Sequence, residues 1–91
     1  MATATASENK IGKVIQVIGP VIDVEFEGGH LPAVYNALRI VATLPTGEKV
    51  DIVTEVEQHL GEGRVRTVAM KPTDGLQRGM DVIDTAAAIS V

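Results

Sequence analysis

The sequence predicts an all-β fold: a small, closed, six-stranded antiparallel Greek-key barrel with one short helical turn in a loop. The chain has one Tyr, one Phe and no Trp, although 45% of its 91 residues are hydrophobic. The core must therefore consist of Val, Ile, Leu and Ala, and the branched residues among them favour pleated surfaces. Short apolar segments alternate with Gly and Pro turn signals, and closing such a sheet removes its exposed edges.

The first two strands are expected within "GKVIQVIGPVIDVEFEGG", on either side of Gly19-Pro20. Before this turn the hydrophobic residues run almost continuously, which is typical of a strand that is covered on both faces or that bends. After it they alternate with acidic residues, as in a half-buried strand. Ile22, Val24 and Phe26 then share one face, and Asp23, Glu25 and Glu27 share the other.

The segment "HLPAVYNAL" carries the helical signal. Pro32 suits a first helical position, and the large apolar side chains recur at spacings of three and four. The segment is too short for a stable helix. We expect a single helical turn within a loop, with Tyr35 as a plug.

The second half of the chain predicts further strands at "ALRIVATL", "KVDIVTEVEQHL", "RVRTVAMK", "MDVID" and "AAISV". Pro45 and Gly47 mark the first turn between them, and "GEG" and "PTDGLQRG" mark the later ones. In the long strand the alternation places one set of side chains on one face: Val50, Ile52, Thr54, Val56, Gln58 and Leu60. Residues 1–10 are expected to form a flexible arm, and residues 11–91 the barrel domain.

The composition excludes several kinds of partner. The net charge is −4, so the chain gains nothing from counterion release on nucleic acid, and it lacks aromatic side chains on which bases stack. It has no Cys, which excludes disulfides and thiolate metal sites. No apolar run approaches the ~20 residues of a membrane helix, so direct membrane insertion is not expected. Residues 1–10 have the features of neither a secretory signal nor a mitochondrial presequence.

No catalytic or cofactor-binding residue is predicted. A phosphate-binding loop needs a second Gly and a hydroxyl at fixed spacing around Gly-Lys, and neither Gly12-Lys13 nor Gly47-Glu48-Lys49 has them. "GEGR" lacks the Lys and does not open a helix. His30 follows two glycines and has no evident partner, and no Ser-His-Asp set is recognisable.

No metal site is predicted either, although Glu55, Glu57 and His59 alternate along one strand face and could in principle meet at a metal ion. A solvated, charged strand face is the commoner explanation of this pattern. Arg64 and Arg66 also share a face. They form either a rim for an acidic partner or a solvated surface.

Lys71 supports an alternative function. It follows Ala69-Met70, and biotinyl and lipoyl carrier domains are small all-β folds that present a Lys in an Ala-Met-Lys-Met-type hairpin. In this chain Pro72 replaces the second Met, which removes a backbone donor and alters the hairpin. The alternative is a carrier domain that is modified at Lys71.

The segments "GKVIQVIGPVIDVEF", "LPAVYNAL", "EVEQHLGEGRVRTVAM" and "PTDGLQRGMDVIDT" strongly resemble the start of the β subunits of rotary proton-translocating ATP synthases. The resemblance extends from about Gly12 to Val91 and combines several motifs in order. It implies an N-terminal six-stranded barrel. In this family such barrels alternate with those of the α subunits and form a crown that holds the catalytic hexamer together.

The resemblance implies a non-catalytic assembly domain, because the family's nucleotide site lies in the following domain. The parent enzyme makes ATP from ADP and phosphate by using the proton gradient. The implied partner is the α subunit, and the isolated barrel could self-associate. We expect a peripheral location on the cytoplasmic side of the inner (plasma) membrane of a bacterium.

The end of the chain departs from the family pattern Asp-Thr-Gly-x-Pro-Ile-Ser-Val. Ala86 and Ala88 stand where the family has Gly and Pro. Gly adopts positive φ without strain and Pro restricts φ. Both replacements are therefore expected to alter a turn near the last strand.

Overall fold

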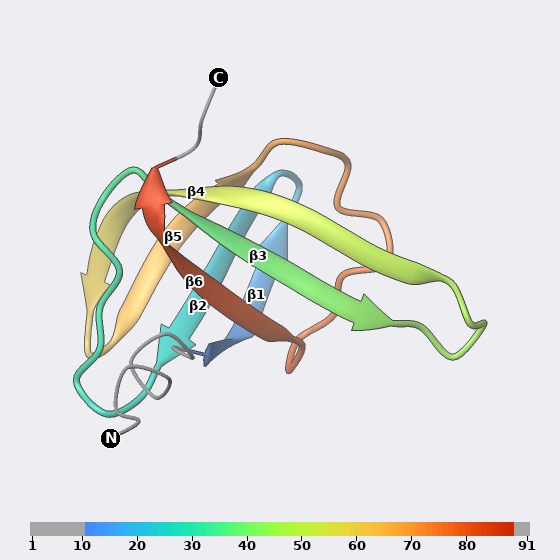
Figure 1. Cartoon of the computed structure of the whole chain (residues 1–91), viewed down its shortest axis with the longest axis horizontal. Helices are drawn as coiled ribbons and strands as arrows, with labels where there is room; N and C mark the ends of the chain where they lie inside the picture. Colours follow the sequence, from blue (N-terminus) through green and yellow to red (C-terminus); the bar gives the residue numbers. More distant parts are fainter. Residues whose placement is uncertain (1–10, 89–91) are drawn as a thin grey trace.

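The computed structural model describes residues 11–88, which form an antiparallel barrel (Figure 1). The predicted N-terminal arm, residues 1–10, and residues 89–91 lie outside the described residues. The described part contains six strands and no helix. The strands are β1 (Ile11–Ile18), β2 (Val21–Phe26), β3 (Asn36–Thr43), β4 (Lys49–Gly61), β5 (Arg64–Ala69) and β6 (Asp81–Ala88).

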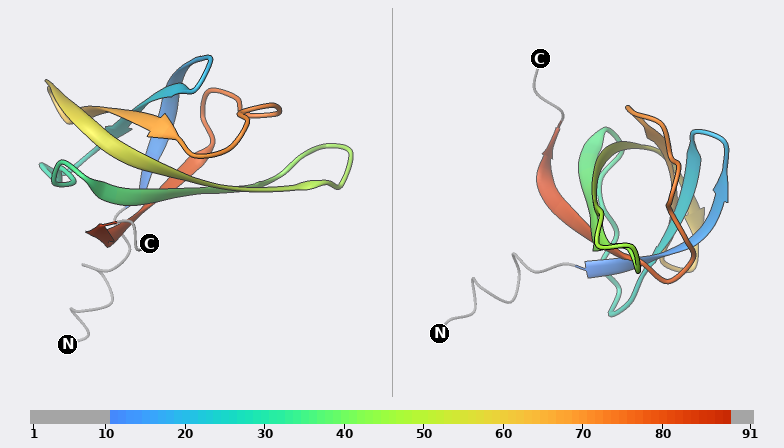
Figure 2. Two further views of the ribbon diagram at one scale, coloured as in Figure 1. Left: turned by 90° about the horizontal axis from the view of Figure 1, so that it is seen from above. Right: turned by 90° about the vertical axis from the view of Figure 1, so that its right-hand side faces the viewer.

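The strands close into a ring in the order β1-β2-β5-β4-β3-β6. Strands β3, β4 and β5 follow one another through hairpins, and β6 returns through a long connection to pair with β3. This arrangement is a Greek key, so the predicted fold class is confirmed. Figure 2 (right) shows the ring from its end, with β6 on one side and β2 on the other.

The core fills the interior of the ring with aliphatic side chains and one aromatic ring. The predicted alternation in β2 is confirmed, because Ile22, Val24 and Phe26 are buried. Asp23 is buried as well, at 5% exposure, although it points outward. The core cluster consists of Val14, Ile22, Val24, Phe26, Leu38, Ile40, Val56, Val65 and Val82.

The alternation predicted for β4 is correct only for its first part. Val50, Ile52, Thr54 and Val56 are buried, but Gln58 and Leu60 are exposed. A bulge lies between Val56 and Gln58, and an extra residue in a strand shifts all following side chains to the other face. Gln58 therefore pairs with the outward Arg66, and His59 pairs with the buried Val65.

The helical turn predicted before β3 is replaced by a tight turn. Asn36 N donates to Ala33 O at 3.0 Å, and β3 begins at once. Tyr35 is not a plug, because its side chain is 63% exposed. Its backbone N donates to Val56 O at 2.7 Å and its φ is 78°. The backbone of this segment thus holds it against β4, and the aromatic ring of Tyr35 lies outside the barrel.

The last strand also differs from the prediction. The two short strands that were expected form one strand, β6, as far as Ala88. Its pairing with β3 is interrupted between Leu38↔Asp84 and Asn36↔Ala88. Ala86 lies in this irregularity with φ 63°, and its N donates to Asp84 Oδ1 at 2.9 Å. Ala86 thus occupies a left-handed position, which Gly would adopt without strain.

Candidate functional site

Arg64 and Arg66, which the sequence placed on one face, form ion pairs with β2. Arg66 binds Asp23 through two hydrogen bonds of 3.0 and 3.1 Å. This hydrogen bonding, together with the charge of Asp23, raises the pKa of the Arg66 guanidinium. Arg64 Nε lies 3.3 Å from Glu25 Oε2. Since both guanidinium groups already have carboxylate partners within the barrel, the acidic-partner hypothesis loses its basis.

Two further ion pairs lie on the outside of the barrel. Lys13 on β1 pairs with Asp81 on β6, and Arg39 on β3 pairs with Asp51 on β4 at 2.6 Å. The hydrogen bonding that Arg39 donates to Asp51, together with the charge of Asp51, raises the pKa of Arg39. Exposed ion pairs of this kind contribute little to stability, because solvent screens them. Their larger effect is to neutralise the charge of the surface between the strands.

Exposed apolar side chains lie beside these ion pairs. Ile11 and Ile83 face each other across β1 and β6, and they are 50% and 37% exposed. Val41, two residues from Arg39 on β3, is also exposed. The outer surface of these strands thus combines apolar side chains with paired charges.

The structure separates Glu55, Glu57 and His59. Because of the bulge, Glu55 and His59 lie on opposite faces of β4. His59 Nε2 is 2.6 Å from Pro32 O, in the loop that precedes β3. Glu55 and Glu57 remain close, and a hydrogen bond to Glu55 raises the pKa of Glu57. Among residues 11–88 no three potential metal ligands come together.

His30 has a partner that the sequence did not reveal. Its Nε2 lies 2.7 Å from Asp84 Oδ2 on β6, and its ring packs edge-on against Phe26 with centroids 5.3 Å apart. The Asp84 carboxylate is buried at 5% exposure. It also accepts the hydrogen bond of Ala86 N. These contacts fasten the loop before β3 to the last strand.

The two Gly-Lys motifs, Gly12-Lys13 and Gly47-Glu48-Lys49, lie in β1 and at the β3–β4 turn. Gly12 is buried within β1, and Gly47 lies in the β3–β4 turn, where its N donates to Leu44 O at 2.8 Å. Neither precedes a helix, and helix N-termini supply much of the phosphate binding in such loops. The structure therefore shows strand backbone at Gly12 and a turn at Gly47.

Lys71 lies in the connection between β5 and β6, and not at the tip of a tight hairpin. Met70 N donates to Val53 O at 3.1 Å, so the chain leaves β5 still paired with β4. Thr73 Oγ1 then binds Gly19 O at 2.9 Å. Since carrier domains need the Lys at a hairpin tip, the geometry does not support the carrier alternative.

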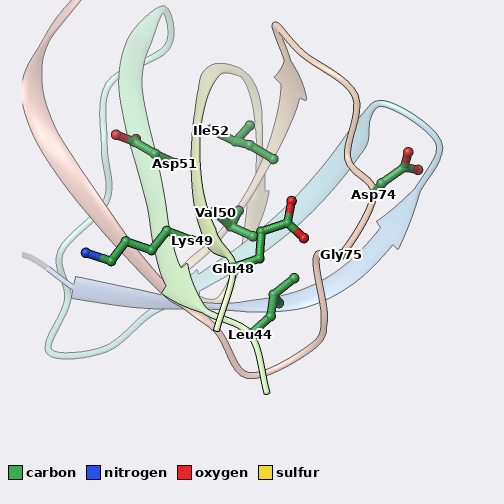
Figure 3. A pocket seen from close by; sticks show the side chains of 8 residues that line it. All are labelled: Leu44, Glu48, Lys49, Val50, Asp51, Ile52, Asp74 and Gly75. Carbon is green, nitrogen blue, oxygen red and sulfur yellow. The ribbon is translucent and has the colours of Figure 1, made fainter. Parts of the chain in front are cut away.

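A pocket of about 290 Å³ lies between the β3–β4 hairpin and the β5–β6 connection (Figure 3). Leu44, Val50 and Ile52 form its apolar part, and Glu48 and Asp74 add two carboxylates. The Lys49 side chain points away from it in Figure 3. Glu48 and Asp74 therefore contribute negative charge to the pocket.

Comparison with known protein families agrees with this architecture. Residues 14–86 match the model of the ATP synthase alpha/beta family, beta-barrel domain. The chain belongs to the ATP synthase alpha/beta family. Its barrel is the β-barrel domain of that family, and this domain is part of a subunit of an enzyme complex. In the described residues no helix is long and apolar enough to cross a membrane.

Proposed function

We propose that this barrel is the N-terminal domain of an ATP synthase β subunit and that its function is assembly. The match of residues 14–86 to the family's barrel domain carries the proposal. The four segments quoted from the sequence favour the β subunit over the α subunit. In this proposal the barrel alternates with α-subunit barrels in a crown that holds the hexamer together, while the parent enzyme makes ATP from ADP and phosphate with the proton gradient.

The proposed domain is non-catalytic. Its pocket carries carboxylates, its Gly-Lys motifs lie in a strand and a turn, and Arg64 and Arg66 already pair with carboxylates of the barrel. The proposed partner is the α subunit, and the proposed location is peripheral, on the cytoplasmic side of the inner membrane of a bacterium.

The test combines two measurements on the purified chain. Titration with Mg²⁺-ATP should give no heat of binding and no shift in melting temperature, because the chain lacks the phosphate loop. Sedimentation with the α-subunit barrel of the same enzyme should show a complex. Saturable ATP binding at micromolar concentration, or the absence of any complex with the α barrel, would contradict the proposal.

A further inference from the structure

We infer that the pocket between the β3–β4 hairpin and the β5–β6 connection binds a small alkylammonium cation. The hydrocarbon chain of the ligand enters the pocket and contacts Leu44, Val50 and Ile52, and its ammonium group stays at the mouth beside Glu48 and Asp74. The inference goes beyond the proposed assembly function and does not depend on it, because it rests on the residues of this pocket alone.

Hydrogen bonds hold the pocket in place on both of its sides. On the side of the hairpin, Leu44 N donates to Glu48 O at 2.8 Å. On the side of the β5–β6 connection, Leu76 N donates to Thr73 O at 3.1 Å, and Thr73 Oγ1 binds Gly19 O at 2.9 Å. Since both sides are already ordered in the folded chain, a ligand loses little affinity to ordering them.

Gly75 keeps the pocket open on the side of the β5–β6 connection. A Cβ at this position would lie 3.3 Å from Leu44 Cδ1 and 3.9 Å from Val50 Cγ2. A side chain there would therefore occupy the space beside these two apolar residues. The pocket has a volume of about 290 Å³, which is near the lower end of the range for small-ligand sites, so it suits a small molecule.

The mouth of the pocket is negatively charged. Glu48 and Asp74 are exposed and come from opposite sides of the pocket (Figure 3). The ion pairs formed within residues 11–88 involve neither of them. Asp51 also borders the pocket, but it is bound by Arg39 and, like Lys49, points away in Figure 3. A ligand cation thus meets two carboxylates that have no cationic partner in the described part of the chain.

This lining favours one class of ligand over others. An anion is repelled by the two carboxylates. A metal ion lacks a third protein ligand, because residues 11–88 contain no group of three potential metal ligands. An alkylammonium uses both parts of the pocket: its head group donates charge-assisted hydrogen bonds to the carboxylates, and its chain removes apolar surface from water. A free alkylamine and the Lys side chain of a peptide both present this chemistry.

The experiment is a nuclear magnetic resonance titration of the isotope-labelled chain at constant ionic strength. Hexylammonium should shift the amide resonances of residues 44–52 and 74–75 in a saturable way. Methylammonium has the head group without the chain and should bind at least about 10-fold more weakly, because it buries almost no apolar surface. Hexanoate has a similar chain and the opposite charge, and it should shift none of these resonances saturably.

Glu48→Gln and Asp74→Asn each remove one charge and keep the shape of the side chain. Each should weaken hexylammonium binding by about 3-fold, and the double variant by about 10-fold, because an exposed ion pair contributes modestly. Glu27→Gln is the matched control, since it removes the same net charge. Glu27 is exposed and follows β2, whereas Gly19, which contacts Thr73, precedes the other end of β2. The control should bind hexylammonium like the unmodified chain.

The spectra also show whether each variant folds. Equal shifts with hexanoate, or unchanged hexylammonium binding by the double variant, would contradict the inference. A loss in Glu27→Gln as large as in the pocket variants would also contradict it, because the net charge alone would then attract the cation. N-acetyl-lysine methylamide distinguishes the two sources. If it binds at least as tightly as hexylammonium, the ligand is the Lys side chain of a peptide, and if it binds more weakly, the ligand is a free alkylamine.

Discussion

At the scale of single residues, Ala86 is one of the non-glycine residues in the described part of the chain that adopt a positive φ, as Tyr35 does. Its φ of 63° is left-handed, a conformation that costs a residue with a Cβ roughly 1–2 kcal/mol more than Gly. The turn persists because Ala86 N binds Asp84 Oδ1 and Thr85 Oγ1 binds Ala37 O, at 2.9 and 2.8 Å. The local hydrogen bonds thus outweigh the strain of the side chain.

Ala86→Gly should therefore stabilise the chain. The relief of strain exceeds the extra entropy of Gly in the unfolded state, and a net gain of about 0.5–1 kcal/mol is expected. Urea denaturation measures it. Ala87→Gly is the control: Ala87 has no positive φ, so Gly there should lower stability. Equal effects of the two substitutions would show that the conformation of Ala86 carries no strain.

Two buried hydroxyl groups in the barrel interior differ in whether they have a hydrogen-bond partner. Thr54 and Thr67 are both fully buried. Thr67 Oγ1 donates to Ile22 O at 2.8 Å, whereas Thr54 Oγ1 is the one buried side-chain polar atom without a partner in residues 11–88. Thr54 is thus a weak point of an otherwise aliphatic core, because an unpaired buried hydroxyl is unfavourable.

At the scale of strands, β4 combines a regular half and an irregular half. Up to Val56 its side chains alternate between core and surface, and beyond the bulge they exchange faces. Glu57 lies at this irregularity, beside Glu55. A protonated Glu57 can donate a hydrogen bond to Glu55, which is why its pKa in the folded chain is raised.

The raised pKa of Glu57 predicts a pH-dependent effect of Glu57→Gln. A carboxyl whose pKa is higher in the folded state stabilises the fold below its unfolded pKa, and this contribution is lost as the pH rises through the folded pKa. The Gln side chain keeps a donor at all pH values. Relative to the unmodified chain, the variant should gain denaturant stability at about pH 7 and lose that advantage at about pH 3.5.

Glu55→Gln should show the same dependence, because either substitution removes the like-charged pair, and the double variant should add little. A Glu57→Gln advantage that is equally large at both pH values would show that the two carboxylates do not interact.

Sequence patterns predicted the strands well and their exceptions poorly. In β2 and the first half of β4, period-two alternation indicated the buried face correctly, because burial itself imposes that period. The bulge after Val56 leaves no comparable mark. The turn before β3 was mistaken for a helical turn, since the spacing of Leu31, Val34 and Leu38 fits both and the decisive bond from Tyr35 N to Val56 O joins distant segments.

The site was less accessible to sequence reasoning than the fold. The partner of His30 is Asp84, which is 54 positions away. The ion pairs of Arg64 and Arg66 depend on the register between β2 and β5, and a shift of one residue would remove both. The residue types indicated which charges were present, but only the strand register showed which of them form pairs.

At the scale of the whole molecule, closure depends on the approach of β1 to its neighbours. Gly12 pairs with Phe26 of β2 and with Val82 of β6. A Cβ at this position would lie 2.7 Å from Glu25 O and 3.0 Å from the Phe26 ring. Gly12 therefore allows β1 to close the ring at a distance that no larger residue permits.

Gly12→Ala should destabilise the barrel by about 1–3 kcal/mol, because the backbone of β2 has to move. Chemical denaturation measures the loss. Lys13→Ala is the control in the same strand: it removes only an exposed ion pair and should cost less than about 1 kcal/mol. If the Gly12→Ala and Lys13→Ala variants were equally stable, β1 and β2 would have room for a Cβ at position 12.

The pairing between β1 and β6 affects how the domain responds to mechanical force. It consists of three residue pairs, from Ile11↔Ile83 to Lys13↔Asp81, and the strands are antiparallel. The polypeptide thus enters and leaves the cylinder at the same end of its shortest junction. Tension applied between these two points would peel the junction open one bond after another, so the domain should withstand traction poorly unless adjacent subunits brace it from the sides.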